Sequence, residues 1–460
     1  GFLIICAWAW RFWMAYIQEK YIKEVNEKKT ILLEIKLPRE IMKSPFAMEN
    51  FILNLNQTSG AGEMYAKYFL GRIPIYFSLE IASLEGIIHF YIRTEERFRL
   101  MLESALYAQY PGIEISKSDD YTKLVHYHHL TKDTSIWGAH FSTAKKWKPT
   151  NPKNGEPYKK DGKDYEIKAD FFPLKTYVDY GLDKDPKEEF KTDPLAQLIE
   201  MMGSIGKGQY FWYQIMVQSE SVFDGNKKFP KFFLNEEAGE RYSLSDMANM
   251  YKKQIRTAGF TVEGKPMLDE YGDVKQKKIG TDKEGKPIFG DAIHKETKPI
   301  SKNEMALTKE EKDELEAINS KLSKPLFCVI IRFLYISHGK DEKHNFNFQN
   351  VYNVLNAFKG FNGMNTLFPI PTAPYDFAWQ DVGGRRTAWR SEEAFNKYVE
   401  REGFFPHANI KHSDDFTSLE AWEDRMFFTS SMKTRKIFHQ LYDIIFHPFS
   451  HPHPENVSVL

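Results

Sequence analysis

The reactive residue types in this chain do not fall into a catalytic spacing. The segment SIGKGQ (204–209) contains a Gly-Lys pair, but it lacks the G-x-x-x-x-G-K-[ST] frame of a phosphate-binding loop and follows a helical pattern instead of a strand. Gly206 and Gly208 are therefore interpreted as residues that end a helix. The sequence has no G-x-S-x-G turn, H-E-x-x-H pair, C-x-x-C pair or kinase motif set. No catalytic or cofactor-binding residue is predicted.

Titratable residues gather in a few places. His126 and His128 share one face of a strand-like run beside His129, a spacing that can bind a metal, but no third ligand is evident. The histidines near the C-terminus, three of them beside prolines, are His439, His447, His451 and His453. The alternatives are exposed or hydrogen-bonded histidines, and an extended His-Pro segment that docks on a partner. Acid pairs such as Asp119-Asp120 and Asp414-Asp415 lie beside turn residues, which favours capping over acid–base catalysis. No metal site is predicted.

Two basic–aromatic segments are the candidate nucleic-acid contacts. Lysine and arginine bind phosphates, and aromatic rings stack on bases. The candidate residues are Lys145, Lys146, Trp147, Lys148, Arg385, Arg386, Trp389 and Arg390. The alternative for the lysine-rich loop 145–163 is a solvated hairpin tip, and for the segment around Trp389 it is a solvated linker.

Composition limits the class of protein. Lys+Arg and Asp+Glu each total 63, so the formal net charge is zero, which argues against a surface that acts as a whole as a polyanion receptor. The chain is 42% hydrophobic and 15% aromatic, which suits large cores, and its 460 residues leave room for several domains. Cys6 and Cys328 lie far apart in sequence and predict neither a disulfide scaffold nor a zinc site.

The most apolar segment, GFLIICAWAWRFWMAYI (1–17), is predicted to be a membrane anchor. A spanning helix needs about 20 apolar residues, so a continuation on the N-terminal side is expected. Its aromatic residues suit a membrane interface, and Arg11 can extend to the headgroups. The basic residues that follow, within a juxtamembrane helix ending at residue 30, are Lys20, Lys23, Lys28 and Lys29. Positive charge there predicts that the bulk of the chain lies on the cytoplasmic side of the membrane. A signal peptide and an ordinary buried helix are the alternatives.

Behind the anchor, residues 31–120 predict one strand–helix–strand–strand–helix–strand module. The strands and helices are expected at 31–38, 44–56, 73–83, 86–94, 95–110 and 111–120, with a hairpin turn at Leu84-Glu85-Gly86. Ser44 is expected to cap the first helix, with Pro45 at its first position. Two helices on one face of such a sheet predict a ferredoxin-like α+β sandwich, a fold that often leaves the other sheet face open.

The same order is predicted again at 173–372, so the fold class is α+β with two ferredoxin-like modules in tandem. Residues 121–172 are expected to be connecting strands and the lysine-rich loop. The second module is expected to begin with a strand at 173–181 and to carry a charged insertion, 222–324, in its central hairpin, where long insertions cost little. The insertion is expected to contain a helix whose start is a capping box, Thr308-x-x-Glu311. Residues 373–460 are predicted as a helical and His/Pro-rich tail.

Several phrases together resemble one family. They are LLEIKLPRE (32–40), SPFAMENFILNL (44–55), 77–115, 193–218 and 307–337. These phrases resemble the non-motor N-terminal region of large membrane-anchored proteins of reduced-genome bacteria, a region that precedes a conjugative, coupling-protein-like ATPase. The resemblance covers about half of the chain and implies a component related to type IV secretion or DNA transfer. The motor and its phosphate loop are missing from this sequence, so no functional residue of the family carries over.

The sequence therefore predicts a membrane-anchored structural protein that acts through protein–protein contacts, and not an enzyme. The expected partners are the membrane, through residues 1–17, other subunits in a homo-oligomer, and a separate motor ATPase. The first alternative is a DNA-engaging accessory domain of a conjugation machine, using the eight basic–aromatic residues named above. The others are the N-terminal part of a longer motor ATPase and an unrecognised hydrolase.

Overall fold

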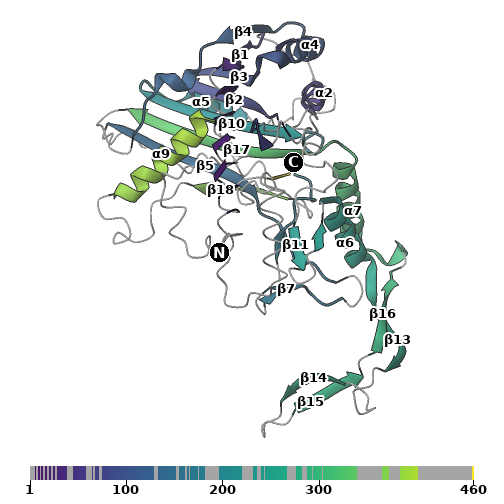
Figure 1. Cartoon of the computed structure of the whole chain (residues 1–460). Coiled ribbons are helices and arrows are strands. Elements are labelled where there is room, and N and C mark those ends of the chain that lie inside the picture. The colour runs from purple at the N-terminus through teal and green to yellow at the C-terminus, as the bar shows by residue number, and fades with distance from the viewer. Residues whose placement is uncertain are drawn as a thin grey trace. The chain divides into compact units, whose positions relative to one another are not determined.

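The computed structural model describes two compact units. The ranges it describes, with short gaps, are 28–38, 45–57, 75–128, 133–181, 196–219, 232–266, 276–338, 365–371 and 384–401, together with scattered positions before residue 28, parts of 65–71, and Ser458–Val459. The first unit comprises 1–145, 173–229 and 322–460, and the second comprises 146–172 and 230–321. Figure 1 shows the elements along the chain.

The first unit begins with the elements that the sequence predicts over 31–120. They are β1 (Thr30–Lys36), α2 (Phe46–Asn54), β2 (Phe77–Leu84), β3 (Ile87–Glu95), a 3₁₀ turn (Glu96–Phe98), α4 (Arg99–Gln109) and β4 (Glu114–Ser118). β1 pairs with both β3 and β4, and β3 pairs with β2, all antiparallel. The predicted α+β class is confirmed. Pro45 lies just before α2, outside the helix, and Ser44 lies outside the described residues.

The second half of the sheet repeats the strand order of the first. Its elements are β5 (Thr134–Thr143), α5 (Ala196–Gly203), β10 (Gln209–Ser219), β17 (Phe327–His338) and β18 (Leu367–Pro371). The full order is β18-β5-β17-β10-β2-β3-β1-β4, and β19 (Ser458–Val459) adds to β17. The halves join where β10 pairs with β2, so one antiparallel sheet of nine strands runs through the unit. The order predicted for the second module requires a second helix, expected at 348–362, and those residues lie outside the described part of the chain.

The predicted first strand of the second module, at 173–181, is wrong. The described residues of that segment form turns, and β5 takes the corresponding place in the sheet. The carboxylate of Asp179 accepts hydrogen bonds from the backbone N–H of Thr176, at 2.6 Å, and from its hydroxyl, at 2.8 Å. Such local side-chain bonds compete with a strand ladder. The repeat therefore begins near Thr134, and residues 146–172 lie between its first strand and its first helix.

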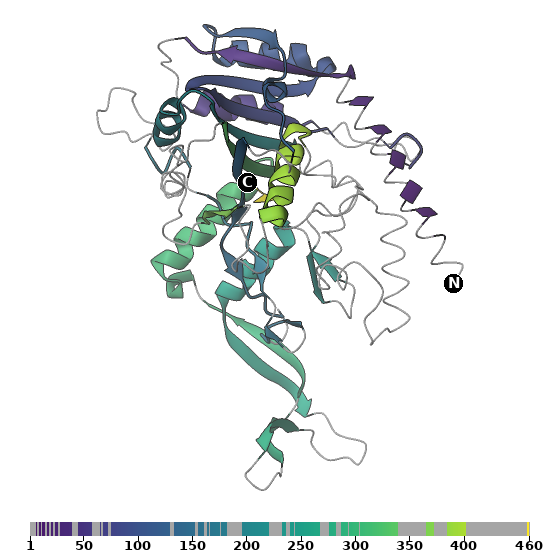
Figure 2. The same ribbon diagram turned by 90° about the vertical axis from the view of Figure 1, so that its left-hand side faces the viewer.

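Helices cover both faces of the sheet. On one face, α2, α4 and α5 contribute Phe51, Leu102 and Met202 to a buried cluster with Phe211 and Phe333. On the other face, α9 (Arg385–Val399) contributes Phe395 and Tyr398 to a second cluster, with Leu32, Tyr91, Tyr121, Trp212 and Leu334. Figure 2 shows α9 crossing the strands. The face that the sequence leaves open is thus covered in part by a helix from the C-terminal segment.

The β2–β3 hairpin turns through Glu85-Gly86, as the sequence predicts. Both residues have positive φ, 55° and 91°, as a type I′ turn requires. A Cβ atom on Gly86 would lie 2.7 Å from the carbonyl oxygen of Ile205, which lies in the loop after α5. The turn therefore requires glycine both for its backbone angle and for the close approach of a second segment.

Replacing Gly86 with alanine is expected to lower the free energy of unfolding by about 1–3 kcal/mol. The new methyl group would meet backbone, which has no rotamer to move away. Gly206→Ala is the matched control, because a Cβ atom added at Gly206 would have nothing within 4 Å and the φ angle there is not positive. Urea unfolding should give a lower free energy of unfolding for Gly86→Ala than for Gly206→Ala. Equal values would contradict this interpretation of the turn.

The second unit holds its own small core. Its elements are β6 (Lys146–Trp147), β7 (Lys159–Lys160), β8 (Lys163–Asp164), β9 (Ile167–Lys168), β11 (Phe232–Asn235), β12 (Glu240–Tyr242), α6 (Leu244–Arg256), β13 (Thr257–Pro266), β14 (Gln276–Thr281), β15 (Pro287–Ala292), β16 (His294–Ser301) and α7 (Lys309–Leu322), the last of which ends at the boundary with the first unit. The rings of Phe171, Phe172 and Tyr251 pack against one another with centroids 4.9–5.3 Å apart.

The capping box at the start of α7 is confirmed, since Thr308 and Glu311 exchange backbone-to-side-chain hydrogen bonds of 2.9 and 3.2 Å.

The N-terminal segment is described at isolated positions, which are helical from Cys6 to Lys28. No helix among the described residues is both long enough and apolar enough to cross a bilayer.

Candidate functional site

A charged cluster is buried between the sheet and the end of α9. The guanidinium of Arg401 binds two carboxylates in bidentate fashion. It donates to Glu80 through Nε and Nη2, at 3.0 and 3.1 Å, and to Asp120 through Nη1 and Nη2, at 2.7 and 2.9 Å. The side chains of Arg401 and Glu80 are 1% and 0% exposed. Three segments far apart in sequence therefore meet at one arginine.

The local structure of each segment directs its side chain into this cluster. Alternation along β2 places Glu80 on the α9 face, together with Ala82, which belongs to the same buried cluster as Tyr398. Asp120 follows β4, where it also caps the next turn by accepting from the N–H of Thr122 at 3.1 Å. Arg401 comes directly after the C-cap of α9 with φ of 55°, a conformation that usually requires glycine or asparagine. Its side-chain bonds offset that backbone cost.

Neutral side chains saturate the Glu80 carboxylate. Ser78 donates to it at 2.6 Å, Gln214 at 2.9 Å and the Tyr121 hydroxyl at 2.7 Å. Because the single proton of Tyr121 goes to Glu80, the hydroxyl of Tyr398, 3.0 Å away, donates to Tyr121. With the two bonds from Arg401, this carboxylate accepts five hydrogen bonds.

These contacts belong to a row of cross-strand residue pairs that runs from one edge of the sheet to the other. On the α9 face, the cross-strand partners run in sequence through Ser116, Glu34, Tyr91, Glu80, Gln214, Arg332, His140 and Ile370. Arg332 donates through Nε to the amide oxygen of Gln214 at 2.7 Å and lies 5.6 Å from the ring centroid of Tyr398. The sheet core thus carries a polar row that spans both halves, and α9 closes over its middle.

The pKa values of the two carboxyl groups and of the two tyrosines are shifted in opposite directions. Burial alone would raise the pKa values of Glu80 and Asp120, but the charge and hydrogen bonds of Arg401 hold both below the ordinary range. Burial, reinforced by the charge of Glu80, raises the pKa of Tyr121 and of Tyr398 well above the usual value. The carboxylates are therefore ionised and the tyrosines neutral at physiological pH, so the arrangement is a stable ion cluster that fastens α9 to the sheet.

Stability is expected to fall with acid because of these two carboxylates. A lowered folded-state pKa means that the unfolded chain takes up protons first, as pH drops below about 5. The stabilisation is complete at neutral pH and is lost as pH falls through the folded-state pKa values. Glu80→Gln should be less stable at pH 7 and should lose less on going to pH 4, measured by urea unfolding. Glu96→Gln, an exposed glutamate, is the control; an unchanged acid dependence in Glu80→Gln would contradict the role of Glu80.

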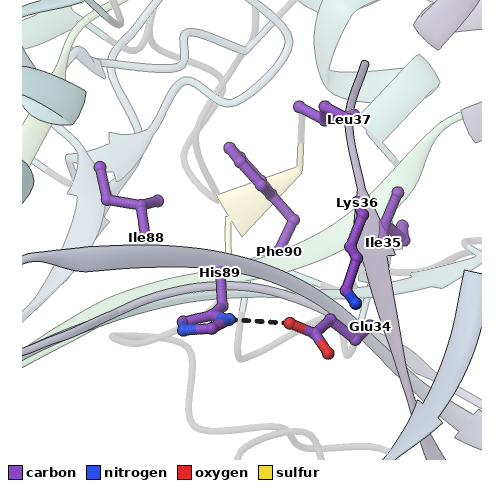
Figure 3. Close-up of a pocket in the computed structure, with 7 residues that line it drawn as sticks. All are labelled: Glu34, Ile35, Lys36, Leu37, Ile88, His89 and Phe90. Carbon is purple, nitrogen blue, oxygen red and sulfur yellow. Dashed lines mark hydrogen bonds and ion pairs between the residues drawn. The ribbon is translucent and has the colours of Figure 1, made fainter. Parts of the chain in front are cut away.

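A shallow hollow lies near the end of β1, lined by Glu34, Ile35, Lys36, Leu37, Ile88, His89 and Phe90, with a volume of about 350 Å³. Figure 3 shows the imidazole of His89 facing the carboxylate of Glu34. Their atoms Nδ1 and Oε1 are 2.7 Å apart, so the pair can be a hydrogen bond or an ion pair. The imidazole and the carboxylate are hydrogen-bond partners of each other, and the hollow offers few further polar groups to a ligand.

The lysine-rich segment does not present its tryptophan to solvent. Trp147 is 6% exposed, packs at 5.4 Å against Phe171, and donates through Nε1 to the Gln254 side chain at 2.8 Å. It belongs to the core of the second unit, so the interpretation of Trp147 as a stacking platform for bases is wrong. Its neighbour Lys148 lies within ion-pair distance of Glu166, at 3.4 Å. Lys146 is exposed, and Lys145 ends the first unit with its N–H bound to Asn365 at 3.0 Å.

The second basic–aromatic group lies at the start of α9. The helix begins at Arg385, so Arg386, Trp389 and Arg390 lie on its first turns instead of on a linker. Trp389 is 41% exposed and Arg390 is exposed. The structure thus places these four residues on one helix of the first unit, whereas the lysine-rich segment belongs largely to the second unit.

The remaining titratable candidates take ordinary places. His126 and His128 are exposed, and His128 approaches Glu392 of α9 at 3.9 Å. Within the part of the chain that the structure describes, no group of three or more His, Cys, Asp or Glu side chains is arranged to hold a metal. The C-terminal histidines and Asp414-Asp415 lie outside that part. Asp120 is a turn cap, as expected. It is also one of the two partners of Arg401, a pairing that no local pattern in the sequence indicates.

Neither a family model, nor a curated protein, nor a solved structure matches this chain.

Proposed function

We propose that this chain is a membrane-anchored structural protein that builds an assembly through protein–protein contacts, related to type IV secretion or DNA-transfer machinery and acting without its own motor. The observation that carries the proposal is the continuous sheet. In the residues that the structure describes, its outer strand β4 pairs on one side only, with β1. An edge of this kind is a natural surface for adding another chain.

The finer fold assignment belongs to the same proposal. The order β4-β1-β3-β2, with α2 and α4 as connections, is the order of a ferredoxin-like βαββαβ module, and β18-β5-β17-β10 repeats it. We infer two such modules fused through β2 and β10. Of the two outer strands that the structure describes, β4 is the one suited to assembly, because Pro369 and Pro371 lie in β18, and proline lacks the N–H that an added strand would need.

The proposed attachment is through residues 1–17, with the bulk of the chain on the cytoplasmic side and a separate ATPase as motor partner. The apolar, tryptophan-rich composition of that segment and the lysines that follow it support this orientation.

Site-directed cross-linking in membranes tests the assembly. In a variant in which Cys6 and Cys328 are serine, Lys117→Cys on β4 should give a dimer-sized product with a short bis-maleimide. Ile87→Cys, 65% exposed on the hairpin, is the control and should stay monomeric. The expected particle in mild detergent is a homo-oligomer by light scattering. A monomeric particle with no cross-link at residue 117 would overturn the assembly role.

A DNA-engaging accessory role is the second candidate, favoured by one observation, the gathering of Arg385, Arg386, Trp389 and Arg390 on the first turns of α9. This function requires DNA affinity that falls steeply with salt and is lost on charge reversal of Arg385 and Arg386. A DNA column run at two salt concentrations distinguishes it from the assembly role, which needs neither result.

A further inference from the structure

A second aromatic segment lies against the N-terminal helix. Trp13 donates through Nε1 to the backbone carbonyl of Tyr68 at 3.2 Å, and the rings of Trp10 and Tyr68 are 5.8 Å apart. Residues 65 and 68 are themselves helical. Two segments separated by about fifty residues of sequence therefore form one local surface, and the second segment was not singled out by its sequence.

The outward side of this surface is aromatic. Its exposed members are Phe12 (58%), Trp13 (45%), Tyr16 (59%), Tyr65 (62%), Phe69 (58%) and Leu70 (52%). Tyr65 and Phe69 stack with centroids 5.4 Å apart. By contrast, Ile17 and Val25 of the same N-terminal helix are buried. The helix thus has buried residues, and its Trp10 and Trp13 contact the segment that carries the exposed Tyr65 and Phe69.

The chemistry of this surface fits a lipid interface. Tryptophan and tyrosine concentrate at the headgroup level of bilayers, because their rings are apolar while their polar atoms remain hydrated. Exposed Lys20 and Lys28 follow on the same helix, and Lys29, directly after it, lies 3.8 Å from Glu24. Basic groups beside an apolar face bind anionic lipid. These six exposed apolar side chains lie in two contacting segments, unlike the singly scattered apolar residues that soluble surfaces normally carry.

We propose that Tyr65, Phe69 and Leu70 form a second, interfacial membrane contact beside the N-terminal anchor, seated among the headgroups of an anionic leaflet. This inference rests on the proposed attachment through residues 1–17 and adds a second point of contact to it. An anchor alone leaves the protein free to rotate about the helix axis. Two contacts fix which side of the sheet faces the membrane.

Depth-dependent fluorescence quenching tests the contact on the full chain. With Cys6 and Cys328 replaced by serine, Phe69→Cys is labelled with a polarity-sensitive dye and bound to phosphatidylcholine–phosphatidylglycerol vesicles. The control is Leu100→Cys, which is 76% exposed on α4. The expected result at position 69 is a blue shift, several-fold weaker quenching by aqueous iodide, and strong quenching by lipids that carry a spin label near the headgroup. Position 100 should show none of these changes.

The outcomes separate the two proposals. If the protein floats with vesicles but position 69 responds like position 100, the interfacial contact is wrong and the anchor stands. Shielding from iodide without quenching by the lipid label would assign the patch to a second copy of the chain, which also overturns the lipid contact. Failure to float would remove the attachment itself. As an independent measurement, Phe69→Ser with Leu70→Ser should weaken vesicle partitioning by about tenfold or more while leaving the anchor in place.

Discussion

Replacing Arg401 with methionine is expected to lower the free energy of unfolding by about 3–5 kcal/mol, the cost of leaving a buried charge without its partner. Two carboxylates lose their counter-charge at once, and Glu80 has no route to solvent, with its side chain 0% exposed. Methionine keeps the length and apolar bulk of the side chain, so the change tests the charge more than the packing. Urea unfolding followed by circular dichroism measures the loss.

One control for this change is on α9, and the other is in the buried charged cluster. Lys397→Met removes an exposed pair with Glu393 one turn away and should cost less than about 0.5 kcal/mol. Adding Glu80→Gln to Arg401→Met should restore part of the loss, because the remaining buried group is then neutral. A loss in Arg401→Met no larger than in Lys397→Met would show that the cluster does not fasten α9.

The consequence for the C-terminal segment follows from the same contacts. α9 covers Trp212 and Tyr91 through Phe395 and Tyr398, and its end is held by Arg401. Loss of the arginine should therefore release α9 before the sheet unfolds. Hydrogen exchange would then increase at the amides of α9 while those of β1 remain protected.

Local patterns in the sequence were enough to predict the first half of the sheet. The strand pattern at 31–38, the helical spacing around Phe51 and Leu102, and the Glu85-Gly86 turn each act over a few residues. The structure has a strand, two helices and a hairpin turn at these places. The capping box of Thr308 and Glu311 is of the same kind. Such features can be predicted from the sequence because the residues that interact are neighbours in the chain.

The features that the sequence did not reveal depend on distant partners. A strand was expected at 173–181, where the second module was predicted to begin, yet Asp179 bonds Thr176 in a turn there. The place of that strand in the sheet is taken by β5, from an earlier part of the chain. Trp147 stands between lysines in the sequence, but its ring meets Phe171 and Tyr251 in a core. Arg401 is an ordinary charge in the sequence, and its partners Glu80 and Asp120 lie about three hundred residues away. Of the candidate site, only the capping role of Asp120 had a local signal.

Phe333→Ala is expected to destabilise the protein by about 3–5 kcal/mol, since a large buried ring would leave a cavity that neighbours fill only in part. Phe333 is 1% exposed and stacks on Phe211, with centroids 5.3 Å apart and planes 15° from parallel. Trp137 lies on another side at 5.2 Å. Leu100→Ala, at a position that is 76% exposed, should change stability by less than about 0.5 kcal/mol.

The same variant shows whether the two halves of the sheet are one folding unit. β2 and β10 are paired from Phe77 with Val217 to Leu84 with Tyr210, and one buried cluster contains residues from both halves. Unfolding of either half would therefore break a ladder and open a core that the other half needs. Phe333→Ala should lower the protection of amides in β1 by the same free energy as in β17, measured by native-state hydrogen exchange. Loss confined to β5, β10 and β17 would instead mean that the halves unfold separately, so that the joint between β2 and β10 could open without unfolding the first half.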